Sequence, residues 1–337
     1  MELSQFPFSQ VATWLTEGSV IPFLGAGASR AGITEASPLP DGRTLADELI
    51  KKMGGAFPGE KDEALAKVAQ FFEQTVFDRP ALQEYIVSRF QKRQEHAQIS
   101  AVARLLASVP VTDRLFLMTT NYDSQIERAM REANRPLCVI TQNMRDPANG
   151  ASLVEVTYPD GTVSQEGATD FQWDDQTRTP DPRTVYLYKM HGSARPSMIP
   201  PEQDEIVVAE DDPEQDDIIE QDDIIITEDD YVDFLVNCGG PVSPYFPPRS
   251  LARVYRTKRF LFLGYSLEDW NFRVFLKLLA LQKTLSGKEK LRHWAIQRDP
   301  SPLDEPLWRQ RNVNLYQADL IDFCRGLEAS WPAGESA

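Results

Sequence analysis

Long hydrophobic runs are missing from this sequence, and cysteines and histidines are rare. The 337 residues include three Cys and three His, and no apolar stretch approaches the roughly 20 residues that span a bilayer. Cys138, Cys238 and Cys324 lie far apart and form no CxxC pair, which argues against a disulfide framework and a structural zinc site. The first residues are acidic and lack the basic region of a signal peptide. We therefore expect a cytoplasmic protein with no metal ion and no membrane partner.

Basic residues are absent from one long segment. Between Glu202 and Asp233 there are sixteen Asp and Glu and no Lys or Arg, and the other 35 acidic residues equal the 35 basic ones. The net charge of −16 therefore belongs to this acidic insertion, residues 202–233, and the rest of the chain is neutral. Because no basic stripe occurs, we expect no direct contact with nucleic acid.

The acidic insertion has two interpretations. Sixteen like charges repel one another, so a solvated and extended loop is the simpler one. A purely solvating segment would contain fewer β-branched apolar residues than this one. The alternative is that it docks on a partner or a neighbouring subunit, and the residues that favour docking are Ile218, Ile219, Ile224, Ile225 and Ile226.

Short apolar runs alternate with segments of helical periodicity. This alternation predicts an α/β fold with a mostly parallel sheet covered by helices on both faces, in one domain over residues 1–337. The predicted strands are 19–25, 114–119, 136–141, a hairpin over 153–163, 184–190, 258–264, 291–296 and 313–316.

Several helices are predicted between and after the strands. Four of them, 43–53, 61–72, 80–93 and 98–108, form a helical block inserted at 43–108 between the first two strands. The others are 123–132, one that begins after Thr227, a long one from Leu267 to about Leu285, 306–311 and 320–329. Polar or glycine-rich segments follow several strands, at the sheet edge where ligands bind in such folds.

Two of these segments follow the first and second strands. The glycines of Gly25-Ala26-Gly27 would let backbone N–H groups approach a phosphate at a helix N-terminus, but a plain tight turn is the alternative. In the segment 119–123, Asn121 and Asp123 stand at alternate positions beyond the strand, so both side chains can reach a cleft. Helix capping by either residue is the alternative function of that segment.

The other two segments lie later in the chain. His191 is the one histidine that follows a predicted strand and precedes a glycine, and a histidine that titrates near neutrality suits acid–base chemistry. Gly264 and Ser266 mark a strand-to-helix turn that can touch a ligand, or that only caps a helix.

Together the four segments resemble the sirtuin-like domain. That family has a GAG-x-S loop after the first strand, a T-x-N-x-D segment, a histidine-glycine pair and a late glycine-serine turn, and all occur here in that order. The sequences of residues 189–193 and 262–269 resemble those of bacterial sirtuin-domain NAD hydrolases of antiphage defence. The resemblance implies a Rossmann-like fold, and the family's zinc ribbon and its Pro-Asp-Phe-Arg segment are missing from this sequence.

The resemblance implies an NADase that uses NAD as its substrate and needs no metal. Asn121 and His191 would be catalytic, and the NAD-binding residues would be Gly25, Ala26, Gly27, Ser29, Thr120, Asp123, Gly264 and Ser266. It also implies a homo-oligomer and a defence partner such as a HerA-type ATPase. Two alternatives stay open: a zinc-free deacylase or ADP-ribosyltransferase, and a subunit that binds NAD or ADP-ribose for regulation or assembly.

Overall fold

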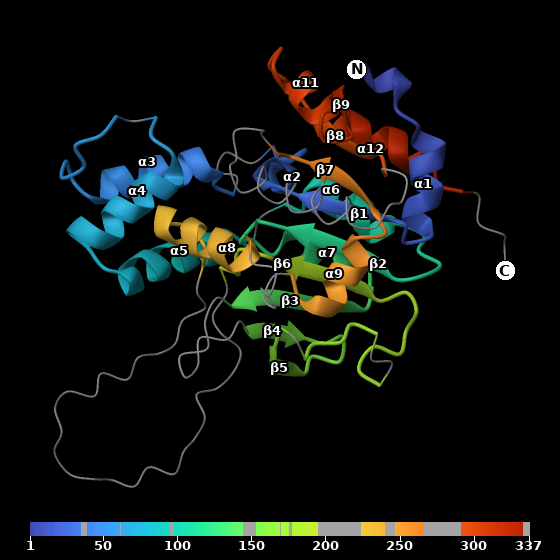
Figure 1. Ribbon diagram of the computed structural model, residues 1–337, viewed down its shortest axis with the longest axis horizontal. Coiled ribbons are helices and arrows are strands. Elements are labelled where there is room, and N and C mark those ends of the chain that lie inside the picture. Colours follow the sequence, from blue (N-terminus) through green and yellow to red (C-terminus); the bar gives the residue numbers. More distant parts are fainter. Residues whose placement is uncertain are drawn as a thin grey trace, which may run out of the picture.

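The computed structural model describes residues 1–34, 39–60, 62–94, 98–143, 153–168, 170–174, 177–194, 224–239, 247–265 and 291–332. Within these ranges the strands form one nine-stranded sheet in the order β5-β4-β3-β6-β2-β1-β7-β8-β9 (Figure 1). The strands are β1 (Val20–Leu24), β2 (Leu115–Thr119), β3 (Leu137–Asn143), β4 (Leu153–Thr157), β5 (Val163–Gly167), β6 (Val185–Lys189), β7 (Arg259–Leu263), β8 (His293–Gln297) and β9 (Val313–Gln317).

The sheet is mostly parallel, as the sequence predicts. The strands from β3 across to β9 all pair in parallel, and only the edge hairpin of β4 and β5 adds antiparallel pairs. Because β1 pairs with β2 on one side and β7 on the other, the chain order reverses at β1. The carboxyl edge beside such a strand is where open α/β sheets bind ligands.

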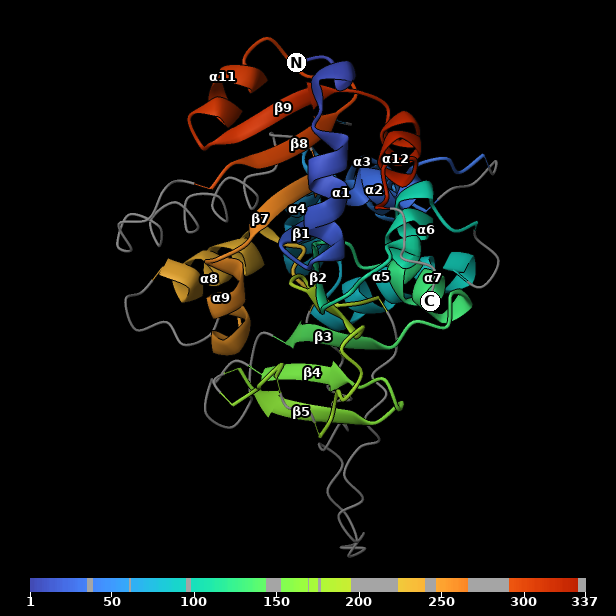
Figure 2. The same ribbon diagram turned by 90° about the vertical axis from the view of Figure 1, so that its right-hand side faces the viewer.

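Alternating apolar side chains of the strands build two cores. In β2, Leu115 and Leu117 join one cluster, while Phe116 and Met118 join the other. The first face is covered by α1 (Phe8–Thr16), α2 (Ala26–Arg30), α6 (Ala101–Ser108), α7 (Gln125–Glu132) and α12 (Leu320–Glu328). The second is covered by α8 (Glu228–Gly239), α9 (Arg249–Tyr255) and α11 (Asp304–Arg309), and Figure 2 shows helices on both sides.

The helical block has a third core of its own. It consists of α3 (Gly42–Lys52), α4 (Leu65–Phe71), the π-helical turn η2 (Phe72–Val76) and α5 (Arg79–Gln94). Leu82, Ile86 and Phe90 give α5 the buried face that their spacing predicts. The fourth predicted helix does not belong here, because α6 packs on the sheet with α7 and α12. We keep the name helical block for α3, α4, η2 and α5.

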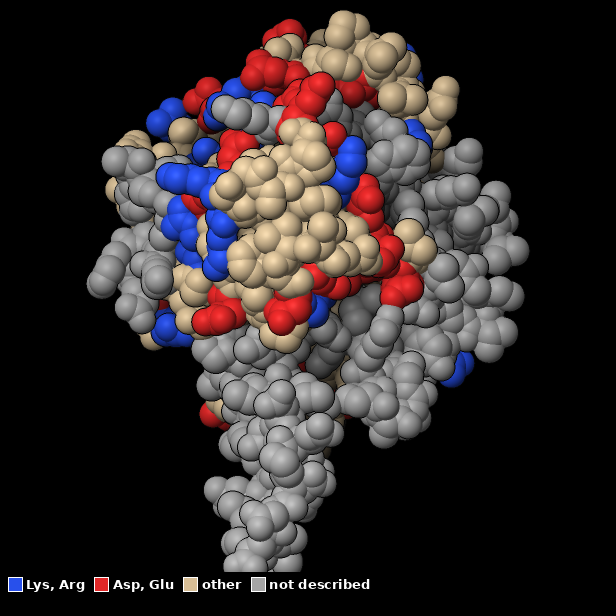
Figure 3. All heavy atoms as spheres, turned by 90° about the vertical axis from the view of Figure 1, so that its left-hand side faces the viewer, with Lys and Arg blue, Asp and Glu red and all other residues tan. Residues whose placement is uncertain are grey.

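The outer face of the molecule on the side of the helical block carries both charge signs. Figure 3 shows uncharged atoms gathered in the middle of this side, with Lys and Arg along one border and Asp and Glu along another. Phe77, which follows η2, is 42% exposed.

The end of the acidic insertion is folded into the protein. Ile224 and Ile226 are buried in the core of the helical block, whereas Ile225 between them packs against the sheet. Each of the three side chains is 1% exposed. An extended, solvated segment through Asp233 is therefore wrong for residues 224–233, because burial of these isoleucines outweighs repulsion among the acidic residues beside them.

Other predictions lie outside the described residues: residues 202–223 of the acidic insertion, the long helix from Leu267, and Ser266. Among the residues that the structure describes, no helix is long and apolar enough to cross a membrane. No group of three or more His, Cys, Asp or Glu suited to a metal ion occurs among them either.

Candidate active site

A cavity of about 280 Å³ lies at the carboxyl edge of the sheet, beside β1. One wall comes from the segments that follow β1, β2, β6 and β7. The opposite wall comes from the helical block and from α8. In Figure 1 the helical block lies at the left, on the side toward which the β3 arrow points. The lining residues are Ala26, Ser29, Arg30, Leu39, Pro40, Gly42, Leu45, Leu65, Phe90, Thr120, Asn121, Tyr122, Asp123, His191, Tyr231, Gly264 and Tyr265.

Seven of the ten predicted site residues line this one cavity. They come from four separate segments and are Ala26, Ser29, Thr120, Asn121, Asp123, His191 and Gly264. Gly25 and Gly27 lie immediately beside the lining but are not part of it. The cavity therefore unites the four segments whose chemistry the sequence singles out.

The two glycines after β1 serve close packing between loops. A Cβ atom on Gly27 would lie 2.9 Å from the Cα of Gly264, and one on Gly264, which has φ +76°, would lie 2.2 Å from the nitrogen of Ala28. The N–H of Gly25 donates to Leu263 and that of Gly27 donates to Gly264. These N–H groups already have partners, so contact of Gly25 and Gly27 with a phosphate stays a prediction.

Asn121 connects the loop after β2 to the loop after β1. Its side-chain nitrogen donates to the carbonyl of Gly25 at 2.9 Å and to the hydroxyl of Ser29 at 2.8 Å. The Ser29 hydroxyl in turn donates to Asp123. The side-chain nitrogen of Asn121 already donates to two protein acceptors. The side-chain carbonyl oxygen is therefore the atom of this amide that can accept a hydrogen bond from a ligand.

Asp123 is buried behind Asn121. Its carboxylate accepts from Ser29 and from the N–H of Gln125 at 3.0 Å. Burial raises the pKa of this carboxyl, and the Ser29 hydrogen bond and the Lys189 charge oppose that shift. The geometry gives Asp123 a role in holding the loop, beside the predicted contact with ribose.

Lys189 stabilises the sheet side of the cavity. The sequence alone does not indicate this role. Its ammonium, on a fully buried side chain, lies 2.9 Å from the carboxylate of Glu127 and 2.6 Å from the carbonyl of Asp123. A buried charge needs such partners. Lys189 is the last residue of β6, two positions before His191, and its ammonium donates to the carbonyl of Asp123. It therefore stabilises both segments where they reach the cavity.

His191 is a buried residue. Its side chain is 3% exposed, and its Nε2 has no hydrogen-bond partner among the described residues. Burial lowers the pKa of His191 to about 3, and the charge of Asp230 opposes that shift. The histidine is therefore neutral at physiological pH, where the sequence alone suggested titration near neutrality.

Three further lining residues are new from the structure. Arg30 is the one Lys or Arg among the described lining residues, and it pairs with Asp41 at the start of α3. The hydroxyl of Tyr265 bonds to Thr120 and to the carbonyl of Leu24, each at 2.8 Å. Tyr231 comes from α8, far along the chain. The position of Arg30 just after the GAG-x-S loop was the signal that could have found it.

Comparison with known proteins identifies the class. The comparison supports a sirtuin-like, NAD-binding domain. Residues 116–316 match the SIR2-like domain, more than half of the chain, so the protein belongs to the SIR2-like domain family. The match begins within β2 and includes the segments of Asn121, His191 and Gly264.

Solved structures and curated proteins were also compared. Sixty-five chains of solved structures match. One is a mutant of a Sir2 homologue in complex with 2'-O-acetyl ADP ribose, with 13% identity, a TM-score of 0.40, and coverage of 97% of this chain and 99% of that chain. No curated protein matches.

Proposed function

We propose that the protein is an NAD glycohydrolase that cleaves the N-glycosidic bond of NAD to give nicotinamide and ADP-ribose. The observation that carries the proposal is the cavity itself, which Asn121 and His191 both line. It lies at the edge of the sheet where the strand order reverses. The family membership supports NAD as the ligand.

The imidazole of His191 suits a hydrogen-bond acceptor. Its Nε2 is buried without a partner among the described residues, an arrangement that costs about 1–3 kcal/mol unless a ligand supplies the missing hydrogen bond. Because burial lowers its pKa to about 3, the imidazole is neutral at physiological pH and can accept a hydrogen bond from a ligand. A ribose hydroxyl or a water molecule would be the donor. Nicotinamide leaves as a neutral molecule from a cationic ring, so departure needs little acid assistance.

Asn121 and Arg30 suit two other tasks. The carbonyl oxygen of Asn121 would accept a hydrogen bond from a ribose hydroxyl or the attacking water, while the side-chain nitrogen of Asn121 keeps the loop after β1 in place. Arg30 would attract the negative charge of the pyrophosphate, because it is the one basic side chain among the described lining residues. Ser29 and Thr120 line the same space and would orient the ribose.

The experiment is cleavage of NAD by the purified chain, with nicotinamide and ADP-ribose identified by mass spectrometry. Asn121→Ala and His191→Ala should each reduce cleavage by about 100-fold or more, the scale of a lost acid–base group. His293→Ala is the matched control, because His293 is 4% exposed against 3% for His191 and does not line the cavity.

Three outcomes would count against the proposed residues or the proposed reaction. Full activity in a folded Asn121 or His191 variant would remove those residues from the mechanism. Product that forms only with an acetylated peptide would indicate a deacylase, and tight binding of ADP-ribose without any cleavage would indicate a regulatory subunit.

We also propose a role in antiphage defence through NAD depletion in the cytoplasm, as a homo-oligomer or with a partner such as a HerA-type ATPase. The support is the resemblance of residues 189–193 and 262–269 to defence-type sirtuin domains, and an acidic insertion suited to a basic partner surface. Attraction of this kind weakens as salt screens it. Replacement of residues 210–223 by a Gly/Ser linker should therefore weaken assembly at low salt and change little at high salt.

A further inference from the structure

A short segment of the chain passes between the helical block and the sheet and covers His191. We call residues 224–231 the cover segment. The N–H of Ile225 donates to the carbonyl of His191 at 3.2 Å, and the hydroxyl of Tyr122 donates to the carbonyl of Ile225 at 2.6 Å. At the end of the segment, the ring of Tyr231 lines the cavity with its centroid 5.7 Å from that of His191. The segment thus contacts the backbone and the ring of His191, and also the side chain of Tyr122, the residue after Asn121.

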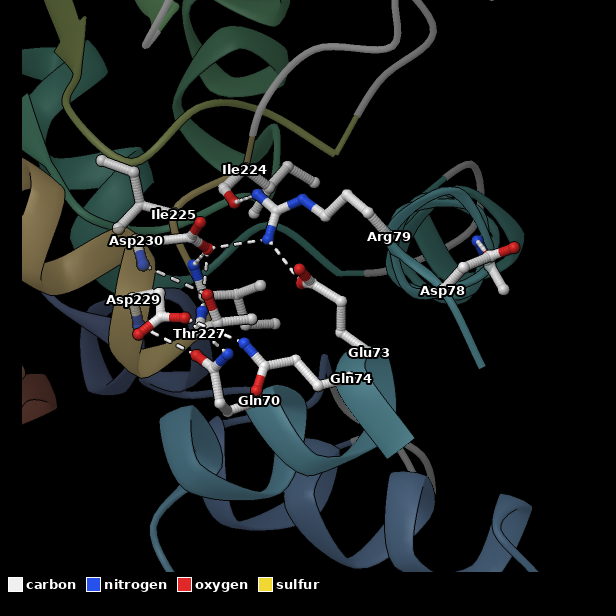
Figure 4. A network of polar contacts seen from close by, with 12 residues as sticks. Gln70, Glu73, Gln74, Asp78, Arg79, Ile224, Ile225, Thr227, Asp229 and Asp230 are labelled. Carbon is white, nitrogen blue, oxygen red and sulfur yellow. Dashed lines mark hydrogen bonds and ion pairs between the residues drawn. The ribbon is translucent and has the colours of Figure 1, made fainter. Parts of the chain in front are cut away.

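Side chains of the helical block hold the cover segment: Gln70 and Gln74 donate to Asp229, and Arg79 contacts the segment at both Ile224 and Asp230. The guanidinium of Arg79, at the first residue of α5, donates to Asp230 at 2.9 Å and to the carbonyl of Ile224 at 2.6 Å. It also donates to Glu73 of η2 at 3.0 Å, so it joins three parts of the chain (Figure 4). The Arg79 side chain is 23% exposed. Burial alone would lower the pKa of Arg79, but Asp230 and Glu73 outweigh that effect and raise it.

The carboxylate that Arg79 contacts also shapes the cover segment. The same oxygen of Asp230 accepts the N–H groups of Ile226 and Thr227, both at 2.8 Å. The Thr227 hydroxyl accepts the N–H of Asp230 in return at 3.2 Å. This reciprocal pair forms the turn that starts α8, and charge-assisted hydrogen bonds of this kind are the stronger ones. Arg79 therefore anchors the turn from which Tyr231 reaches the cavity.

We propose that Arg79 is a positioning residue, which fixes the cover segment over His191 and so keeps the wall formed by Tyr231 in place for catalysis. The inference rests on the proposed function for its catalytic part only. Loss of the guanidinium would leave the carboxylates of Glu73 and Asp230 without their shared cation and the carbonyl of Ile224 without its donor. The segment would then separate from α5, and the wall of the cavity would open.

The same helix provides a matched control. Arg89 is 22% exposed and pairs with Glu48 of α3, so Arg79 and Arg89 are ion-paired arginines of α5 with nearly equal exposure. The Arg89–Glu48 pair joins α5 to α3, two helices of the helical block. Arg79→Gln and Arg89→Gln should therefore cost similar stability and differ only at the cover segment.

The first measurement is amide hydrogen exchange of the full-length chain, which needs no enzymatic activity. Arg79→Gln should speed exchange at Ile225, Ile226 and Thr227 by about tenfold or more, since one charge-assisted hydrogen bond exceeds the energy of a tenfold change. Arg89→Gln should leave exchange at these three amides as in the parent. Unchanged exchange in Arg79→Gln, or equal acceleration in both variants, would overturn the inference.

The second measurement is NAD cleavage. We expect kcat/KM to fall by about tenfold or more in Arg79→Gln, to stay near the parent in Arg89→Gln, and to recover in part in Arg79→Lys. A lysine keeps the charge but lacks the planar fork that reaches three acceptors. If Arg79→Gln does not fold, Arg79→Lys is the variant that tests the inference. It should exchange faster and cleave NAD more slowly than the parent.

The two measurements separate this inference from the proposed function. Fast exchange at the cover segment with unchanged cleavage would disprove the positioning role and leave NAD hydrolysis intact. A parent protein without any cleavage would disprove the proposed function, and slow exchange in its Arg79→Gln variant would disprove the anchoring as well.

Discussion

The two walls of the cavity are held together in different ways. On the sheet side, the segments that follow adjacent strands are joined by hydrogen bonds and by a buried ion pair. The side chain of Asn121 donates to the carbonyl of Gly25, and Lys189 pairs with Glu127. On the opposite side, α8 is held by side chains from the helical block, such as Arg79, from a distant part of the sequence. The first wall is part of the parallel sheet, whereas the second joins separate parts of the fold through polar contacts and through the buried isoleucines of the cover segment.

This difference suggests that the two walls have different roles in the site. A wall built from strand ends keeps the proposed catalytic groups in fixed geometry, as precise chemistry requires. A wall held by partly exposed ion pairs is easier to detach, and segments that open locally come from the less stable parts of a fold. The following predictions test whether the sheet side is the more rigid of the two.

Lys189 should give the largest effect. In Lys189→Met, Glu127 stays buried without its cation, and loss of one partner of a buried pair costs about 3–5 kcal/mol of unfolding free energy. The measurement is chemical denaturation at neutral pH.

Lys67→Met is the control, because the ammonium of Lys67 pairs with Glu63 on the surface and its side chain is 54% exposed. We expect no measurable change there. A double variant, Lys189→Met with Glu127→Leu, should recover much of the lost stability. Equal midpoints for the parent and Lys189→Met would mean that the sheet wall does not depend on this pair.

Gly264 should give the next largest effect, through contact between loops. Gly264 and Gly161 have φ of +76° and +87°, so alanine is strained at both, but only at Gly264 would the new Cβ meet another atom. Gly264→Ala should therefore lower the unfolding free energy by about 1–3 kcal/mol more than Gly161→Ala, the usual cost of overpacking. Thermal and chemical unfolding of both variants measure the difference. Equal losses would show that the β1 and β7 loops can separate without cost.

The sheet and the sheet side of the site could be predicted from the sequence because their signals are local. Short apolar runs mark the central parallel strands β1, β2 and β7, and the residues directly after such strands reach the cavity by topology alone. Asn121 and His191 are of this kind. The residues that support this wall are harder to predict, because a lysine at the end of a strand, such as Lys189, gives no sign in the sequence of the carboxylate of Glu127 beside it.

The second wall could not be predicted, for a physical reason. The acidic residues near Asp230 look solvated in sequence, and their partners, Arg79 and Gln70, come from a helical block about 150 residues earlier. The alternation of Ile224, Ile225 and Ile226 between two cores arises only once that block packs on the sheet. The low pKa of His191 has the same origin, because burial under α8 causes it.

The pH dependence of stability should test that burial directly. Burial lowers the pKa of His191 from 6.5 to about 3 in the folded protein. Between these values the unfolded chain binds a proton that the folded protein does not bind. The contribution of His191 to stability is therefore fully present above pH 6.5 and is lost as the pH falls toward 3, by at most about 1.4 kcal/mol per pH unit.

The comparison is between the parent and His191→Gln, with unfolding free energies measured from pH 7 to pH 4. Asp123 acts in the opposite sense, because burial raises its pKa, so only the difference between the two proteins isolates the histidine. The parent should lose stability more steeply than the variant on acidification. Since α8 causes the burial, Arg79→Gln should reduce this extra steepness if it opens the second wall, whereas Arg89→Gln should keep it. Parallel curves for the parent and His191→Gln would mean that His191 is already solvated, and that the cover segment does not close over it.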